Sequence, residues 1–144
     1  MRMLVYKFMS VWLFAENEFN REIDEQNNFQ YFPIQKKILV RKKILNNDYL
    51  VTYVTKIMKI TDIRQVISNE PKILPKNIKY DRDFDCYLET KLIKKKNPTE
   101  WIDRSQIFPQ LEIFINKIPN LVLLNAPVKL NENDSKKIFS FFNS

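Results

Sequence analysis

The stretch Tyr49-Leu50-Val51-Thr52-Tyr53-Val54-Thr55 is the clearest secondary-structure signal in the chain, and it decides the fold class. Every residue in it except Leu50 is β-branched or aromatic, which favours a strand. The preceding Asn46-Asn47-Asp48 favours a turn, because Asn and Asp side chains hydrogen-bond to nearby backbone and tolerate positive φ. The two stretches together predict a strand that begins directly after a tight turn.

Further β-rich stretches lie on both sides of this strand. Strands are predicted at Val11 to Phe14, Lys59 to Ser68 and Phe84 to Ile93. Phe29 to Pro33 is predicted to form an aromatic loop, and Pro71 and Pro75 bound another loop.

Short helices are predicted between and after the strands. Glu18 to Gln26 has apolar residues four positions apart, Ile107 to Ile118 precedes Pro119, and a last helix begins at Asn131. The chain shows no repeat and no linker. We therefore expect one α+β domain over residues 1–144, a small twisted β-barrel with short peripheral helices.

The composition excludes most catalytic machinery. The chain has 144 residues, no Gly, no His and one Cys, Cys86. The absence of Gly removes Gly-rich phosphate loops, and the absence of His removes Ser-His and Cys-His dyads and His-based metal motifs. Cys86 allows no internal disulfide and is expected to be buried and inert. We expect no catalysis, no cofactor and no bound metal.

The charge favours an anionic partner. Lys and Arg number 24 against 17 Asp and Glu, which gives a net charge of +7, so nucleic acid is the first expectation. The apolar stretch Met3 to Phe14 is short and interrupted by Lys7, so it predicts neither a signal peptide nor a membrane span. The expected location is cytoplasmic.

Four stretches, taken in order, resemble the EVE domain, a PUA-like family related to the YTH domains. They are Trp12-Leu13-Phe14 with Glu16-Asn17, Asn47 to Val54, Ile60 to Ser68, and Val128 to Ile138. Asn47 and Asp62 stand where the family has Gly, and Gln65 stands where it has an acid. Lys, Ile and Asn dominate the composition, which indicates AT-rich coding DNA in which Gly codons are easily replaced.

The resemblance implies a PUA-like barrel that binds nucleic acid, with one flipped or single-stranded base, modified bases included, held in an aromatic pocket. The family's Trp-Gly pair is replaced by Phe29 to Pro33, so other aromatic side chains must form the pocket walls. The candidate base-binding residues are Trp12, Asn17, Tyr31, Phe32 and Tyr80. For each single aromatic, and for Trp12 above all, a place in the core is the competing interpretation. Asn17 fits equally well as a helix N-cap.

Basic residues next to the aromatic loop are candidates for phosphate binding. Lys36, Lys37 and Arg41 follow it directly, and basic side chains beside stacking aromatics suit a nucleic-acid strand. The run Lys94-Lys95-Lys96 is expected to be a solvated turn.

Two alternatives come from other functional classes. Asp85, Glu89 and Lys91 form an acidic pattern that small Mg²⁺-dependent nucleases use, although E-x-K arises by chance in Lys-rich chains. A protein-interaction module is the other alternative. A basic rim around an aromatic pocket would favour base binding, convergence of Asp85 and Glu89 a nuclease, and a closed pocket with an exposed apolar patch an interaction module.

Three structural predictions follow from these assignments. Tyr31 and Phe32 should line a pocket that is open to solvent. Asn47 should have a positive φ, since it stands in a Gly position. Residues 1–8 should form an N-terminal extension that lengthens the first strand or covers an edge or a partner surface.

Overall fold

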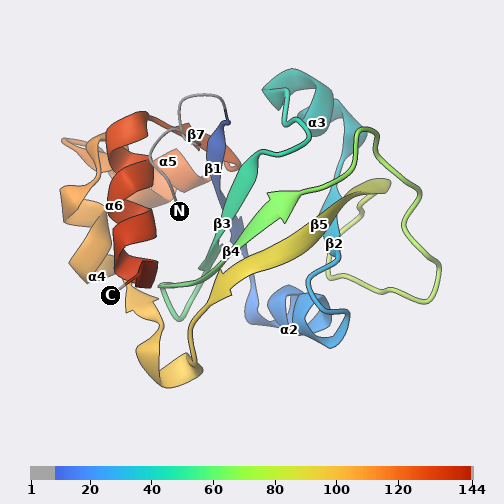
Figure 1. Cartoon of the computed structure of the whole chain (residues 1–144), viewed down its shortest axis with the longest axis horizontal. Helices are drawn as coiled ribbons and strands as arrows, with labels where there is room; N and C mark the ends of the chain where they lie inside the picture. Colours follow the sequence, from blue (N-terminus) through green and yellow to red (C-terminus); the bar gives the residue numbers. More distant parts are fainter. Residues whose placement is uncertain (1–8, 144) are drawn as a thin grey trace.

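The computed structural model describes residues 9–143 as an α+β fold built on one mixed, curled sheet. The strand order is β2-β5-β4-β3-β1-β7, and β6 pairs with β4 (Figure 1). The strands are β1 (Val11–Glu16), β2 (Tyr31–Ile34), β3 (Tyr49–Val54), β4 (Lys59–Val66), β5 (Cys86–Lys95), β6 (Ile102–Asp103) and β7 (Val128–Leu130). The predicted role of residues 1–8 concerns a segment outside the described residues.

Within residues 9–143, five helices and three short 3-10 turns lie between these strands or, for the last helix, after them. They are α2 (Glu18–Gln26), α3 (Lys36–Lys42), α4 (Arg104–Ile107), α5 (Pro119–Leu123), α6 (Glu132–Asn143), η1 (Pro98–Glu100), η2 (Phe108–Gln110) and η3 (Glu112–Phe114). Helices α4, α5 and α6 lie together on one side of the sheet, whereas α2 and α3 lie near opposite ends of β2 (Figure 1). Among the described helices, none has the length and apolar character that a membrane crossing requires.

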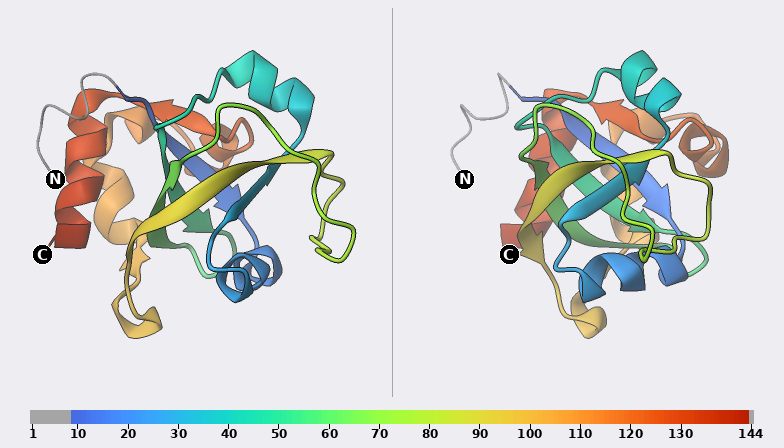
Figure 2. Two further views of the ribbon diagram at one scale, coloured as in Figure 1. Left: turned by 45° about the vertical axis from the view of Figure 1, so that its right-hand side comes forward. Right: turned by 90° about the vertical axis from the view of Figure 1, so that its right-hand side faces the viewer.

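The sheet is buried on both faces because successive strand residues point to opposite sides. On β1, Val11 and Leu13 pack with the C-terminal helices, in a core that also holds Ile107 and Ile138. Trp12 and Phe14 point the other way and form a second core with residues of β2, β3 and β5. Both views in Figure 2 show the curl of the sheet, and the residues of the second core come from its strands β1, β2, β3, β4 and β5.

The curl is a half-barrel with an open seam. Strand β1 pairs with β3 in parallel and with β7 in antiparallel, whereas β2 pairs only with β5. The curl nevertheless brings Phe14 of β1 against Phe32 of β2, with ring centroids 4.9 Å apart. Within residues 9–143, side chains rather than strand hydrogen bonds therefore link β1 to β2.

Several local predictions are confirmed. The predicted helix Glu18 to Gln26 is α2, and Asn17 caps it by accepting a hydrogen bond from the Asn20 backbone N–H at 2.8 Å. Asn47 has φ 75°, as expected of a residue in a Gly position. Asn131 caps α6 through a hydrogen bond from the Asp134 backbone N–H at 2.8 Å.

Two local predictions are wrong. The aromatic stretch Phe29 to Pro33 contains the edge strand β2, in which Pro33 is tolerated because one side of the strand has no ladder partner. The predicted helix Ile107 to Ile118 is replaced by the 3-10 turns η2 and η3. Phe108, Leu111 and Phe114 are buried at a spacing of three, the period of a 3-10 helix.

Candidate functional site

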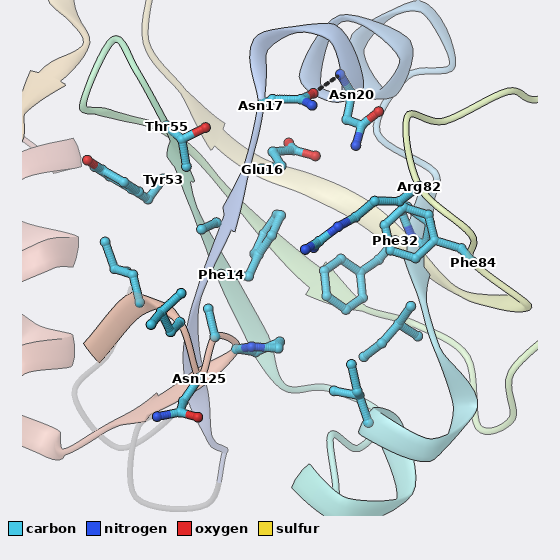
Figure 3. A pocket seen from close by; sticks show the side chains of 18 of the residues that line it. Phe14, Glu16, Asn17, Asn20, Phe32, Tyr53, Thr55, Arg82, Phe84 and Asn125 are labelled. Atoms are coloured by element: carbon cyan, nitrogen blue, oxygen red, sulfur yellow. Dashed lines mark hydrogen bonds between the residues drawn. The ribbon is translucent and has the colours of Figure 1, made fainter. Parts of the chain in front are cut away.

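A groove of about 900 Å³ lies along the open seam of the half-barrel. Its walls come from β1, β2, the start of α2, α3, the loop before β5, and the segment around α5 (Figure 3). Its lining residues include Phe14, Glu16, Asn17, Asn20, Phe32, Pro33, Ile38, Arg41, Tyr53, Thr55, Lys56, Asp81, Arg82, Phe84, Arg104, Asn120, Leu124 and Asn125. The groove therefore exists because β1 and β2 meet without forming a strand pair.

Three phenylalanines form an aromatic wall. Phe14 and Phe32 project from the inner faces of β1 and β2 and are almost completely buried, so each shows the groove only a small part of its ring. Phe84, in the loop before β5, is half-buried and supported edge-on by Tyr80, with ring centroids 5.9 Å apart. The wall thus combines two fixed rings with one more exposed ring, an arrangement on which a planar ligand can stack.

Basic side chains exceed acidic ones around this wall. Arg41, Lys56, Arg82 and Arg104 line the groove. Arg104 is fixed, since its Nη1 donates to the Tyr53 hydroxyl at 3.2 Å and to Asn120 Oδ1 at 3.0 Å. Arg82 is exposed and extends across the groove towards Phe14 (Figure 3). The electrostatic character of the groove favours an anionic ligand.

An Asn-Asp network fixes the end of the groove near α2. Asn17 Oδ1 accepts the Asn20 backbone N–H, and Asn17 Nδ2 donates to Asp81 Oδ2 at 3.0 Å. The Asp81 backbone N–H donates to Asn20 Oδ1 at 2.7 Å. Asn17 is therefore engaged as a cap and as a tether for the loop that carries Arg82 and Phe84.

A buried charge cluster lies directly behind the aromatic wall. The fully buried guanidinium of Arg64 contacts Asp62 Oδ1 at 2.8 Å, Asp24 Oδ2 at 2.9 Å and Glu16 Oε1 at 3.0 Å. Its Cζ also lies 5.2 Å from the Phe14 ring centroid, a cation–π distance. The cluster therefore holds in place the strand end from which Phe14 and Glu16 reach the groove.

The members of this cluster titrate differently. Burial and the neighbouring Asp24 raise the pKa of Glu16 well above its ordinary value, against the opposing effect of Arg64. Burial also works to raise the pKa of Asp62, but the charge and hydrogen bond of Arg64 outweigh it and lower that pKa. Glu16 therefore faces the groove with a raised pKa, beside the buried Arg64 and the Asp62 carboxylate whose pKa is lowered.

The structure places three of the predicted base-binding aromatics outside the groove lining. Trp12 is buried in the inner core and donates from Nε1 to Asp48 Oδ2 at 3.0 Å. Tyr31 points to the opposite side of β2 from Phe32 and packs edge-on against Tyr87, with centroids 4.7 Å apart. Tyr80 donates its hydroxyl to Asp24 Oδ1 at 2.6 Å. Of the pair Tyr31 and Phe32, only Phe32 lies in the groove wall.

The predicted basic residues also separate. Arg41 lines the groove near α3, whereas Lys36 and Lys37 are exposed on the first turn of α3 and do not line it. The Lys36 backbone N–H donates to Asp85 Oδ1 at 2.8 Å, so Asp85 serves as a partner for the start of α3.

The acidic residues of the nuclease pattern do not converge. Asp85 is bound to the start of α3, while Glu89 on β5 pairs with Lys72 at 2.8 Å. Lys91 is exposed further along β5. No group of three Cys, Asp or Glu side chains among residues 9–143 is arranged to hold a metal ion.

Several groove residues were not predicted from the sequence. Phe14 was assigned to a strand core, and its position directly before Glu16-Asn17 was the available signal. Arg82 and Phe84 follow each other closely in a loop after two prolines, and a loop containing both Arg and Phe is a typical place for ligand contacts. Asn20 gave no signal, because a polar residue on a short helix is ordinary.

Comparison with known proteins shows that the fold of this chain is similar to that of several solved structures. No known family model matches the sequence, and no curated protein matches it. Among the solved structures that match is the YTH domain-containing protein mmi1 in complex with RNA, with a TM-score of 0.66 and 12% identity over 94% of this chain and 82% of that chain.

Two further structures extend this likeness. The YTH domain of Zygosaccharomyces rouxii MRB1 in complex with N6-methyladenosine RNA has a TM-score of 0.66 and 11% identity, covering 94% of this chain and 87% of that chain. A hypothetical protein from Leishmania major has a TM-score of 0.64 and 8% identity, covering 95% and 96% respectively. At these identities the chain shares the fold of these proteins.

Proposed function

We propose that this chain is a non-catalytic module that binds single-stranded nucleic acid, with one base inserted into the seam groove. The observation that carries the proposal is the aromatic wall of Phe14, Phe32 and Phe84 inside a groove lined by four basic side chains. Stacking of one base on an aromatic face contributes about 1–3 kcal/mol and tolerates every base, while basic side chains add a salt-dependent attraction for phosphates.

The size and charge of the seam groove suit a nucleic-acid strand better than a free base. A volume of about 900 Å³ lies at the upper end of the range of ordinary small-ligand pockets, roughly 300–1,000 Å³. Arg41 lies on α3, Lys56 lies in the turn after β3, and Arg104 is the first residue of α4. We propose that these three side chains contact phosphates on either side of the inserted base, and that the Asn17 network fixes the loop above it.

The fold likeness supports the same class of ligand. Two of the YTH domains described above were solved with RNA, one of them with N6-methyladenosine RNA, so RNA, with a modified base among the candidates, is the proposed partner. The sequence resemblance further supports a place in the PUA-like EVE group. The dispersed positions of Asp85 and Glu89 give no support to a nuclease.

The test is a salt series with a groove variant and a matched control. Purified protein is titrated with single-stranded RNAs of roughly ten nucleotides, carrying adenine or N6-methyladenine at the centre. Phe84→Ala should weaken binding by about 5- to 150-fold, the equivalent of one lost stack. Tyr31→Ala, which removes a half-buried ring outside the groove, should change the affinity less than twofold.

The outcomes separate the interpretations. Salt-sensitive binding that Phe84→Ala leaves unchanged would contradict insertion of a base and leave only attraction to a basic surface. A higher affinity for the methylated RNA would identify the modified base as the ligand, and equal affinities would remove the modification from the proposal.

A further inference from the structure

The amide of Asn20 presents a free donor to the groove. Asn20 is 4% exposed and lines the groove. Its Oδ1 accepts the backbone N–H of Asp81 at 2.7 Å, and since a backbone N–H can only donate, the oxygen must face Asp81. The Nδ2 group therefore points the other way, into the groove, and donates to no described residue (Figure 3). The Nδ2 atom itself is accessible from the groove, so a ligand or a water molecule can accept its hydrogen bond.

Arg82 supplies a second set of free donors. Its guanidinium extends into the groove beneath Glu16 and next to Phe14 (Figure 3). Within residues 9–143 it forms no ion pair, and its charged atoms donate no hydrogen bond to the protein. A guanidinium has five N–H donors and no acceptor, and its planar fork matches a pair of neighbouring acceptors.

The nearby carboxylates accept hydrogen bonds from residues other than Arg82 and Asn20. Asp81 Oδ2 accepts from Asn17 Nδ2. Glu16 Oε1 accepts from Arg64 Nη2 at 3.0 Å. Arg82 and the Asn20 amide are therefore free donors beside the aromatic wall, and they come from two different segments, the loop before β5 and the start of α2.

We infer that the groove selects a base whose edge carries carbonyl oxygen, with Arg82 and Asn20 as the donors that read it. This inference rests on the proposed insertion of a base. Guanine fits best, because O6 and N7 are two adjacent acceptors that an Arg fork can contact together, and uracil follows with its O4. On that same edge adenine and cytosine carry an amino group where guanine and uracil carry a carbonyl oxygen, so at least one of the two donors loses its acceptor there.

The test uses short RNAs that differ only in the central base. With constant flanks and a central G, U, A or C, the wild-type protein should bind the G strand about 5- to 150-fold more tightly than the A strand. Arg82→Gln should reduce that preference to less than threefold. Lys79→Gln is the matched control, because it removes an exposed positive charge from the same loop without touching the groove lining.

A second variant replaces the free donor of Asn20 by an acceptor and keeps the hydrogen bond from the Asp81 backbone N–H. Asn20→Asp keeps an oxygen for the Asp81 N–H but replaces the free donor by an acceptor, so the ratio of G to A affinities should fall or invert. Unfolding curves of the variant test whether it remains folded. A variant that merely loosened the loop would lower all four affinities together, and that result would overturn the role of Asn20.

The failures are distinguishable. Equal wild-type affinities for the four strands would overturn the inference and leave base insertion standing. If Arg82→Gln weakened all four strands by one factor and lowered the salt dependence by about one phosphate contact, Arg82 would be a phosphate ligand and the inference would be wrong. If the wild-type protein bound none of the strands at low salt, the proposed function itself would fail.

Discussion

At the scale of single residues, the charges behind the aromatic wall give the protein a distinct dependence on pH. Glu16 has a raised pKa in the folded protein, so its contribution to stability is complete below its ordinary pKa of 4.5 and is lost as pH rises through the raised value. Asp62, whose pKa is lowered, behaves in the opposite way and loses its contribution as pH falls. The two side chains therefore limit stability from opposite ends of the pH range.

A Glu16→Gln variant tests the first of these effects. Between pH 4.5 and the raised pKa, the wild-type protein should lose up to about 1.4 kcal/mol of unfolding free energy per pH unit relative to the variant, because glutamine cannot ionise. Urea unfolding at a series of pH values measures the difference. Glu22→Gln, on the exposed face of α2, should follow the wild-type profile. Identical pH profiles for Glu16→Gln and the wild type would show that the pKa of Glu16 is the same in the folded and the unfolded protein.

At the scale of elements, Asp134 connects two parts of the chain that the sequence presents as separate. This buried carboxylate on the first turn of α6 accepts the backbone N–H groups of Glu112 at 2.8 Å and of Ile113 at 3.1 Å. It therefore fixes the start of η3. The sequence pattern of Ile107 to Ile118 indicates one helix, whereas the structure has two 3-10 turns there. The contact from Asp134 is more than twenty residues away in the sequence, so the local pattern could not reveal it.

Removal of this carboxylate should be costly. We expect Asp134→Ala to lower the unfolding free energy by about 2–3 kcal/mol, because the part-buried N–H groups of Glu112 and Ile113 lose the acceptor that the fully buried Asp134 carboxylate supplies. Glu132→Ala, at the first residue of the same helix, removes only an exposed i,i+4 ion pair with Lys136. This variant should lose less than about 0.5 kcal/mol of unfolding free energy. Denaturant titration compares the two variants, and equal costs would show that the bonds to η3 contribute nothing special.

The predictability of the elements follows from the range of the interactions that form them. Helix α2, the turn at Asn47 and the strands β1, β3 and β4 depend on local pattern and were predicted to within a few residues. Strand β2 depends on pairing with β5, more than fifty residues later, and its short aromatic sequence gave no sign of it. The groove was predicted only in part, at Asn17, Phe32 and Arg41, because its lining is assembled by the curl of the sheet.

At the scale of the whole molecule, a bound RNA strand should stabilise the folded protein. At a free RNA concentration of one hundred times Kd, the proposed ligand adds about 2.7 kcal/mol, which raises Tm by roughly 5–10 °C for a chain of this size. Thermal unfolding monitored with and without RNA measures the shift. Phe84→Ala should show a smaller shift at the same RNA concentration, and a full shift in that variant would place the ligand elsewhere.

The unpaired seam has a further consequence for how this molecule accommodates ligands. Because β1 and β2 are joined at the seam by the edge-to-face contact of Phe14 and Phe32 and not by a strand ladder, their separation can change without loss of backbone hydrogen bonds. An aromatic pair of this kind contributes about 0.5–1.5 kcal/mol beyond its buried area, little more than thermal energy. The width of the seam can thus adjust while every strand ladder stays intact, so that the same groove can admit a pyrimidine or a purine.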